Sequence, residues 1–176
     1  MIFQPLGVDG AYLVEPERIE DARGFFARTW CEREFAERGL NPCVKQCNLS
    51  LSLKRGTLRG LHFQAAPYEE AKLVRCVRGA IYDVVLDLRR ASPTFLRHAA
   101  LILRAQDYRA VYVPEGVAHG FQTLVEECEV AYQMSAAYAP ECARGVRWND
   151  PAFGIEWPIA EPVLSSRDRA FPDFIP

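Results

Sequence analysis

Short apolar segments separated by Pro and Gly dominate the hydrophobic pattern of this chain. Five of them are rich in β-branched and aromatic residues, as strands are, and run over residues 72–77, 80–88, 99–104, 110–113 and 129–134. Many strands at close spacing, with almost no helix, predict an antiparallel sandwich or barrel whose inner face can hold a ligand.

One helix is predicted, over residues 30–38. Thr29 and Glu32 have the spacing of a capping box, Phe35 supplies an apolar position, and Gly39 follows as a stop signal. The 176 residues show no break in composition and are enough for one sizeable core. We therefore expect residues 1–176 to form a single all-β domain with one short helix.

Charge and composition narrow the classes of partner. The net charge is −2 with both signs mixed, so no extended field attracts nucleic acid or an anionic membrane. The chain starts without the features of a signal peptide, and no apolar run approaches the roughly 20 residues of a membrane span. We expect a cytoplasmic protein. The six cysteines contain no C-x-x-C pair, which favours free thiols over a zinc site.

Candidate chemistry is densest between residues 58 and 72. Arg59 and His62 lie close together, and Lys72 opens one of the predicted strands. An imidazole that accepts a proton, beside cationic groups that hold developing negative charge, suits the removal of a proton next to a carbonyl. A lone histidine is more often a hydrogen-bonded core residue, but the neighbouring arginine and lysine favour catalysis.

His119 and Asp83 are two further polar residues that could line a binding site. His119 follows a turn that contains Pro114 and Gly116, at the start of a further strand, where binding groups are common. Asp83 shares one strand face with Val85. That face meets either a polar interior or solvent, and the alternation leaves both possibilities open.

Ordered motifs extend over nearly the whole chain. They cover residues 23–26, 46–50, 58–64, 72–74, 87–89, 92–94, 113–121, 145–151 and 164–168, together with Tyr132 and Tyr138. In this combination the chain resembles the dTDP-4-dehydrorhamnose 3,5-epimerase family. The resemblance implies a cupin-like double-stranded β-helix (jelly roll). It also implies a cofactor-independent epimerase of a nucleotide-diphospho-4-keto-6-deoxy sugar.

The resemblance assigns roles to four catalytic residues. His62 matches the base that removes the proton beside the ketone, and Asp168 matches the carboxylate that orients its ring and stabilises the imidazolium. Tyr132 matches the proton donor on the opposite face, and Lys72 holds the oxyanion. Without the resemblance, a buried strand tyrosine and an exposed strand lysine would be the commoner interpretations of the last two.

The implied substrate also needs binding groups, and arginine suits the oxygens of a diphosphate. Arg23 and Arg59 are the phosphate candidates, Asn48 and His119 match substrate contacts, and Tyr138 matches the residue that stacks on the base. The full set of substrate-binding candidates is Arg23, Asn48, Arg59, Asp83, His119, Tyr138 and Arg167. Family members form homodimers by exchange of an N-terminal strand, so we expect a homodimer in which Arg23 reaches the partner's pocket.

Two residues depart from the family pattern. Arg28 stands where dTDP-sugar epimerases usually carry glutamate, and Arg167 replaces a typical lysine. Since Arg28 concerns the expected nucleotide end of the site, a GDP- or CDP-linked sugar is an alternative substrate. Inversion at C3 or C5 alone is another alternative.

Two other classes of function stay open. A P-x-G-x-x-H sequence that ends at His119 resembles half of the metal-binding pattern of cupin enzymes. However, His-Phe-Gln at 62–64 replaces the expected His-x-His, which leaves a weak ligand set for a transition metal, and we expect no metal. The third interpretation is a non-catalytic module that binds sugar nucleotides, which the intact set of catalytic residues disfavours.

Overall fold

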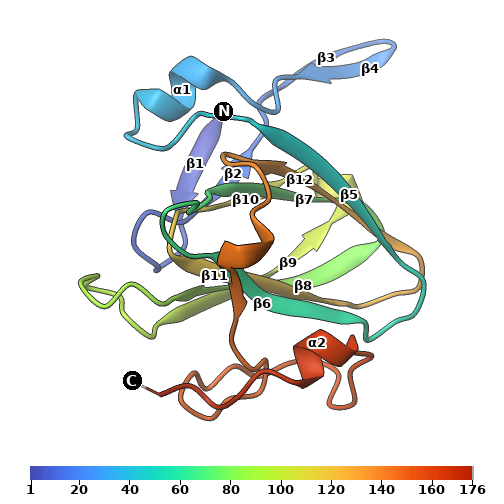
Figure 1. Cartoon of the computed structure of the whole chain (residues 1–176). Helices are drawn as coiled ribbons and strands as arrows, with labels where there is room; N and C mark the ends of the chain where they lie inside the picture. Colours follow the sequence, from blue (N-terminus) through green and yellow to red (C-terminus); the bar gives the residue numbers. More distant parts are fainter. Residues whose placement is uncertain (176) are drawn as a thin grey trace.

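The computed structural model describes residues 1–175, and its main feature is a pair of facing β-sheets (Figure 1). The larger sheet has the strand order β1 (Ile2–Pro5), β2 (Tyr12–Glu15), β10 (Ala110–Val113), β7 (Lys72–Arg78), β12 (Cys128–Met134) and β5 (Gln46–Ser52). The smaller sheet has the order β13 (Ala143–Gly145), β6 (Leu58–Gln64), β11 (Val117–Thr123), β8 (Ala80–Asp87) and β9 (His98–Arg104). All strand pairs within them are antiparallel, and the predicted all-β jelly roll is confirmed.

The five predicted strands correspond to β7, β8, β9, β10 and β12, and each predicted boundary lies within one residue of the observed one. The predicted helix over 30–38 is too long, because α1 covers only Glu32–Ala36. Its capping box is wrong as well, since Cys31 is the N-cap residue and makes no side-chain bond. Gly39 does end the helix, with φ +70° and its N–H bonded to the carbonyl of Ala36 at 2.9 Å.

Short turns of helix that were not predicted complete the chain. They are α2 (Ser166–Arg169) and the 3₁₀ turns η1 (Ala105–Asp107) and η2 (Pro140–Cys142). In residues 1–175, no helix has the length and apolar character needed to cross a membrane.

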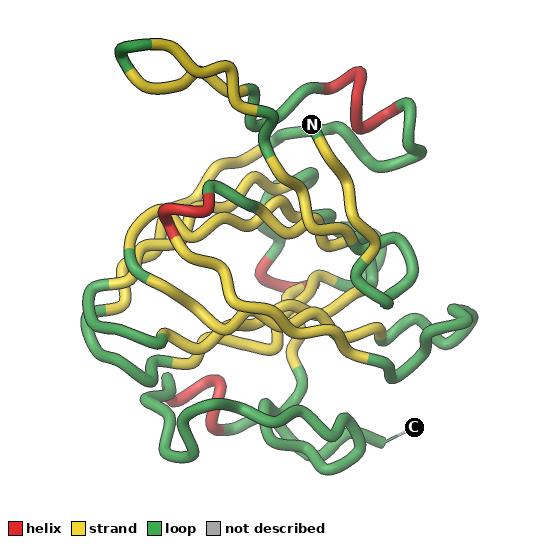
Figure 2. Tube along the Cα trace, turned by 180° about the vertical axis from the view of Figure 1, so that it is seen from behind, coloured by secondary structure: helices red, strands yellow, loops and turns green. Residues whose placement is uncertain are grey.

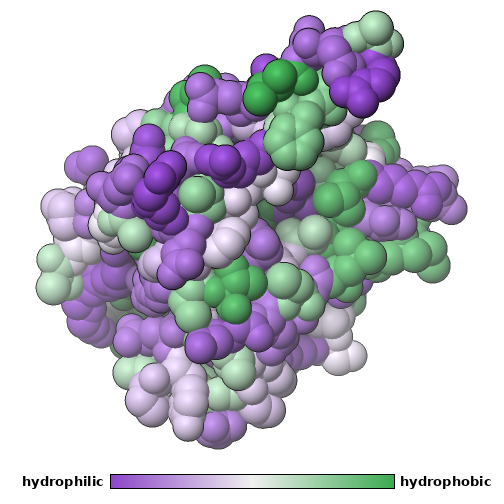
Figure 3. Space-filling view, turned by 90° about the horizontal axis from the view of Figure 1, so that it is seen from above, coloured by the Kyte–Doolittle hydropathy of each residue, from purple (hydrophilic) through white to green (hydrophobic). Residues whose placement is uncertain are grey.

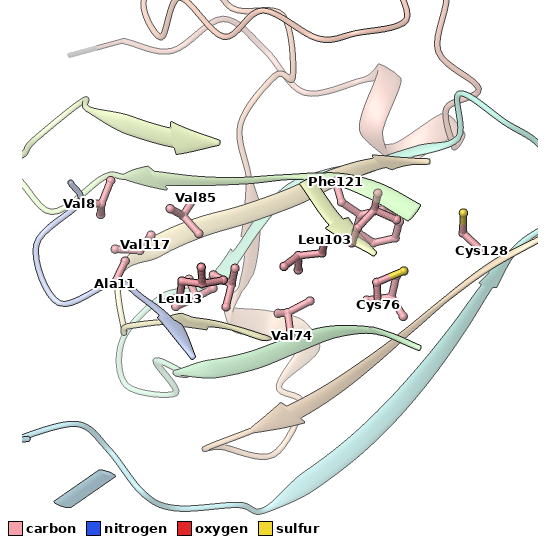
Figure 4. Close-up of a cluster of buried hydrophobic side chains, with 14 residues drawn as sticks. Val8, Ala11, Leu13, Val74, Cys76, Val85, Leu103, Val117, Phe121 and Cys128 are labelled. Atoms are coloured by element: carbon pink, nitrogen blue, oxygen red, sulfur yellow. The ribbon is translucent and has the colours of Figure 1, made fainter. Parts of the chain in front are cut away.

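The main hydrophobic core lies between the two sheets (Figure 4). From β8, Ile81 and Val85 point into this core. Val84 and Leu86 point the other way and pack against the C-terminal segment, residues 146–174. The two faces predicted for this strand are therefore confirmed. Asp83 shares the inner face and is fully buried, which settles its surroundings in favour of the interior.

A two-stranded hairpin formed by β3 (Arg18–Asp21) and β4 (Gly24–Ala27) projects from the body of the molecule (Figures 1 and 2). Ile19 and Phe26 on it are 70% and 73% exposed. The C-terminal segment lies at the opposite end of the molecule and covers the outer face of the smaller sheet (Figure 1).

Candidate active site

The candidate site is built on β6 and β11, where the two strands come unusually close. The register shifts just beyond the pair formed by His62 and His119. Regular alternation would place Arg59 and His62, three residues apart, on opposite faces, but with this irregularity both line one cavity. Glycines make the close approach possible, since a Cβ on Gly60 would lie 2.5 Å from the Cα of Gly120.

This cavity has a volume of about 350 Å³, within the range of small-molecule sites. The four predicted catalytic residues line it, namely His62, Lys72, Tyr132 and Asp168. Four of the substrate-binding candidates do so as well: Asn48, Arg59, His119 and Arg167. The fold thus brings side chains of β5, β6, β7, β11, β12 and α2 together from distant parts of the sequence.

His62 is held by a carboxylate. Its Nε2 lies 2.5 Å from Oδ1 of Asp168, which sits in α2 where Ser165 caps the backbone N–H of Asp168 at 3.0 Å. Burial opposes ionisation of Asp168, but hydrogen bonding and charge from His62, with help from Ser165 and Arg167, lower its pKa overall. Because an ionised carboxylate only accepts hydrogen bonds, Nε2 donates the hydrogen of this bond, and in the neutral ring the free lone pair is therefore on Nδ1.

Lys72 is almost completely buried, with 6% exposure. Its Nζ reaches from the larger sheet to the smaller one, where it donates to the carbonyl of His62 at 3.0 Å, and it pairs with Oε1 of Glu70 at 3.3 Å. Burial lowers the pKa of Lys72, and the charge and hydrogen bond of Glu70 oppose that effect without cancelling it. Sequence analysis missed Glu70, although its position two residues before Lys72 places both side chains on one side of an extended chain.

Tyr132 presents a protonated phenol to the cavity. Burial raises its pKa to about 12; the hydrogen bond of Ser50 and the charge of Arg59 act in the opposite sense, and Asp83 adds to the rise. The hydroxyl of Ser50 lies 3.3 Å from the phenol oxygen. Ser50 was also missed as a site residue, because no rule of spacing links it to a tyrosine 82 residues later.

A second histidine–carboxylate pair lies deeper in the molecule. Nε2 of His119 is 2.8 Å from Oδ2 of Asp83, and both side chains are buried. The ring of His119 stands edge-on to that of Tyr132, with centroids 6.4 Å apart. Asp83 therefore fixes the orientation of a ring that lines the cavity.

Cationic groups lie around the cavity. Arg59 is anchored on β5, donating from Nε to the hydroxyl of Ser52 and from its terminal nitrogen to the carbonyl of Leu51, each at 3.1 Å. Arg167 lies on α2, with its guanidinium 5.9 Å from the ring centre of Phe171. These two guanidinium groups leave donors that suit phosphate oxygens.

Two predicted site residues lie elsewhere. Tyr138 is 56% exposed and lines an adjoining cavity of about 180 Å³, which shares Asn48, His62 and Arg167 with the first. Arg23 lies in the β3–β4 hairpin, where its side chain is 89% exposed and pairs with Asp21. Within one chain Arg23 therefore lies away from the cavity, and its expected place in the pocket of a partner subunit stays a prediction.

The residues of the metal-enzyme alternative are engaged in other bonds. Nε2 of His62 and Nε2 of His119 each face a carboxylate. The amide of Gln64 donates to the carbonyl of Tyr68 at 2.8 Å and accepts from the N–H of Ala139 at 2.7 Å. Within residues 1–175, no three His, Cys, Asp or Glu side chains are grouped so that they could hold a metal ion.

Comparisons of the sequence and of the structure with known proteins find the same group of enzymes. The family model for dTDP-4-dehydrorhamnose 3,5-epimerase matches residues 5–175. A curated dTDP-4-dehydrorhamnose 3,5-epimerase of Sinorhizobium fredii is 40% identical over 98% of this chain and 89% of its own length. A dTDP-4-dehydrorhamnose 3-epimerase of Streptomyces niveus is 42% identical over 96% of this chain and 82% of its own length. The crystal structure of dTDP-4-dehydrorhamnose 3,5-epimerase from Elizabethkingia anophelis superposes with a TM-score of 0.96 at 38% identity, covering 99% of this chain and 96% of that one.

Proposed function

This chain belongs to the dTDP-4-dehydrorhamnose 3,5-epimerase family, and we propose that it is an isomerase that inverts the carbons beside the ketone of a dTDP-linked 4-keto-6-deoxy sugar. One observation carries this proposal. A carboxylate-bound imidazole, a buried ammonium group and a protonated phenol line the same cavity.

The first step is removal of a proton from the carbon next to the ketone. Nδ1 of His62 accepts this proton, and the electron pair of the broken C–H bond moves into the carbonyl to form an enolate. The carboxylate of Asp168 stabilises the resulting imidazolium. A positioned base of this kind is typically worth about 10²–10⁴-fold in rate.

The enolate needs a cationic partner, and Lys72 supplies it. Its ammonium lies inside the cavity, shielded from water, where a single preorganised donor is worth roughly 3 kcal/mol to a developing oxyanion.

The second proton comes from Tyr132 on the opposite face of the sugar. The phenol donates its proton to the enolate carbon, the carbonyl re-forms, and the centre is inverted. The phenolate and the imidazolium then return to their starting states by exchange with water. Solvent hydrogen therefore enters the product at each inverted carbon.

Arg59 and Arg167 bind the diphosphate in this proposal, with Asn48 and His119 as further substrate contacts. Tyr138 lies over the adjoining cavity, where an exposed ring can stack on the base. Asp83 acts by holding His119.

We infer that the protein is a homodimer in which the β3–β4 hairpin carries Arg23 to the partner's cavity. The projecting hairpin and the edge strand β5 support this, since Leu49, Leu51 and Leu53 expose apolar surface that a partner would cover. Figure 3 shows hydrophobic surface in green beside the projecting hairpin.

Inversion at one carbon is the second candidate. The relative from Streptomyces niveus is a 3-epimerase and is as similar to this chain as the relatives that act on both carbons. Arg28, which departs from the family pattern, raised the alternative of a GDP- or CDP-linked sugar. Its guanidinium is paired with Glu34 at 3.0 Å, and the related proteins are named for dTDP sugars, so we propose a dTDP sugar as the substrate.

Deuterium labelling tests the proposal. The protein is incubated in D₂O with dTDP-4-dehydro-6-deoxyglucose and, in parallel, with the GDP- and CDP-linked 4-keto sugars, and NMR follows the sugar protons. We expect deuterium at C3 and C5 of the dTDP sugar. Label at one carbon identifies a single-position epimerase, and binding without label identifies a non-catalytic module.

A further inference from the structure

A buried ion pair lies at the junction of the two cavities. Glu70 and Lys72 are 8% and 6% exposed, and Oε1 of Glu70 lies 3.3 Å from Nζ of Lys72. The neighbouring Glu69 is exposed. A carboxylate is almost never buried without a partner, so the position of Glu70 depends on the ammonium group.

The backbone holds both side chains in place. Ala71, which lies between them, exchanges two hydrogen bonds with Ser135: its N–H donates to the hydroxyl at 2.7 Å, and its carbonyl accepts the backbone N–H at 2.9 Å. Because side chains alternate along an extended chain, this anchor directs Glu70 and Lys72 to the same side. Lys72 also donates to the carbonyl of His62, so its Nζ is held from two directions.

The charges around Lys72 explain why a carboxylate is needed there. Burial disfavours a charged ammonium. The cationic groups that line the two cavities add repulsion, and they are Arg59 of β6, Arg144 of β13 and Arg167 of α2. The other titratable groups are His62 with Asp168, His119 with Asp83, and the phenols of Tyr132 and Tyr138. Both carboxylates of these pairs are bound to histidines, so Glu70 is the acidic partner that contacts Lys72.

We propose that Glu70 is a positioning residue of the reaction: its carboxylate keeps the Lys72 ammonium charged and holds it where the ketone oxygen arrives. This inference rests on the proposed function, because it assumes that Lys72 stabilises an enolate. A neutral amine is a weaker donor to an oxyanion than an ammonium group. Glu70 thus acts on the reaction through Lys72 without touching the substrate.

The protonation of Lys72 can be measured without turnover. The lysines of the chain are Lys45, Lys54 and Lys72, and because the first two are exposed, the ¹⁵Nζ signal of the buried Lys72 should stand apart from theirs. We expect Glu70→Gln to lower the pH midpoint of Lys72 by about 1 pH unit or more, since an opposite charge at this range has that effect. Lys45 and Lys54 serve as internal references, and Glu69→Gln is the matched control that leaves the midpoint unchanged.

Kinetics then link this protonation to the reaction. At a pH where the wild type keeps Lys72 charged and the variant does not, Glu70→Gln should lower the rate of deuterium incorporation roughly tenfold. KM should change much less, and the alkaline limb of the rate profile should move down with the NMR midpoint. Glu70→Asp retains the charge on a shorter side chain and should fall between the wild type and Glu70→Gln.

The outcomes separate this inference from the proposed function. A Glu70→Gln protein with the wild-type Lys72 midpoint and pH profile overturns the inference. So does a Glu70→Asp protein as impaired as Glu70→Gln. If Glu70→Gln does not fold, Glu70→Asp is compared with the wild type, and an unchanged Lys72 midpoint and pH profile in Glu70→Asp overturns the inference, because its shorter side chain should lower both. A wild-type protein that incorporates no deuterium refutes the proposed function, whatever the titration shows.

Discussion

At the scale of single residues, the site depends on two proton-carrying groups in opposite states. His62 keeps a free lone pair because Asp168 occupies its other nitrogen, whereas Tyr132 keeps its proton because burial raises its pKa to about 12. The cavity therefore holds one group placed to accept a proton and another that keeps a proton to donate.

Replacing Tyr132 separates its role from that of His62. We expect Tyr132→Phe to retain exchange at the face served by His62 but to lose inversion by about 10²-fold or more, since only the donor is removed. NMR of the sugar in D₂O measures both rates. Tyr82→Phe is the matched control, because Tyr82 packs against Trp157 on the far side of the smaller sheet. Near-wild-type rates of both processes in Tyr132→Phe would remove the phenol from the mechanism.

The sequence could indicate individual site residues more readily than the contacts between them. Arg59 and His62 are only three residues apart, so the sequence could suggest that they lie in one cavity. Asp168 lies 106 residues beyond His62, and only the family resemblance connected the two. For Asp83, alternation defined a strand face but not whether that face was inside, because this depends on the second sheet.

At the scale of secondary structure elements, the turn between β8 and β9 is organised by Asp87. Its fully buried carboxylate accepts hydrogen bonds from Arg89 at 2.8 and 2.9 Å, from Ser92 at 2.5 Å and from Thr94 at 2.6 Å. Burial alone would raise its pKa, but these bonds lower it to about 2. The pKa of Asp87 is therefore lower in the folded protein than in the unfolded chain, where an aspartate has a pKa of about 3.9.

This difference predicts a pH dependence of stability. The carboxylate stabilises the fold fully above about pH 4, and the contribution is lost as pH falls through about 2. Asp87→Asn should therefore lower the free energy of unfolding by about 3 kcal/mol at pH 7, and the gap should roughly halve between pH 5 and pH 3. Urea unfolding measures both quantities. The exposed Asp21→Asn is the control and should leave the free energy of unfolding close to that of the wild type at every pH. A gap that does not vary with pH would refute this account of the turn.

Strand β5 and the β3–β4 hairpin were both missed from the sequence, each for its own physical reason. Strand β5 does alternate polar and apolar residues, but the polar Asn48 and Ser50 line the cavity while the apolar Leu49 and Leu51 are 65% and 47% exposed. This arrangement reverses the usual core pattern. The β3–β4 hairpin is exposed on both faces, so it has no hydrophobic period from which it could be predicted.

At the scale of the whole molecule, the pattern of strands was enough for the all-β class, whereas the jelly-roll fold came from the family resemblance. The cover over the smaller sheet could not be foreseen, because the C-terminal segment is mostly irregular and buries Phe153 without a strand or helix pattern. The hairpin with Arg23 likewise acquires a role only if a second copy of the chain is present.

Mixing two variants tests whether Arg23 acts on the partner's cavity. Arg23→Ala should raise KM tenfold or more through loss of a charged contact, and His62→Ala should be inactive. If Arg23 serves the other subunit, a mixed dimer has one intact site, and co-refolded protein should recover up to about a quarter of the wild-type activity. A mixture of His62→Ala with Lys72→Ala is the control, since both residues line the same cavity of one chain. No recovery in the first mixture would contradict action in the partner's cavity.

The most direct measurement is hydrogen exchange at the sugar in the His62→Ala protein. Incubated in D₂O with dTDP-4-dehydro-6-deoxyglucose, this variant should bind dTDP as tightly as the wild type, because the guanidinium groups that suit the diphosphate are unchanged. It should incorporate no deuterium at C3 or C5. Deuterium at either carbon at the wild-type rate would show that another group removes the proton.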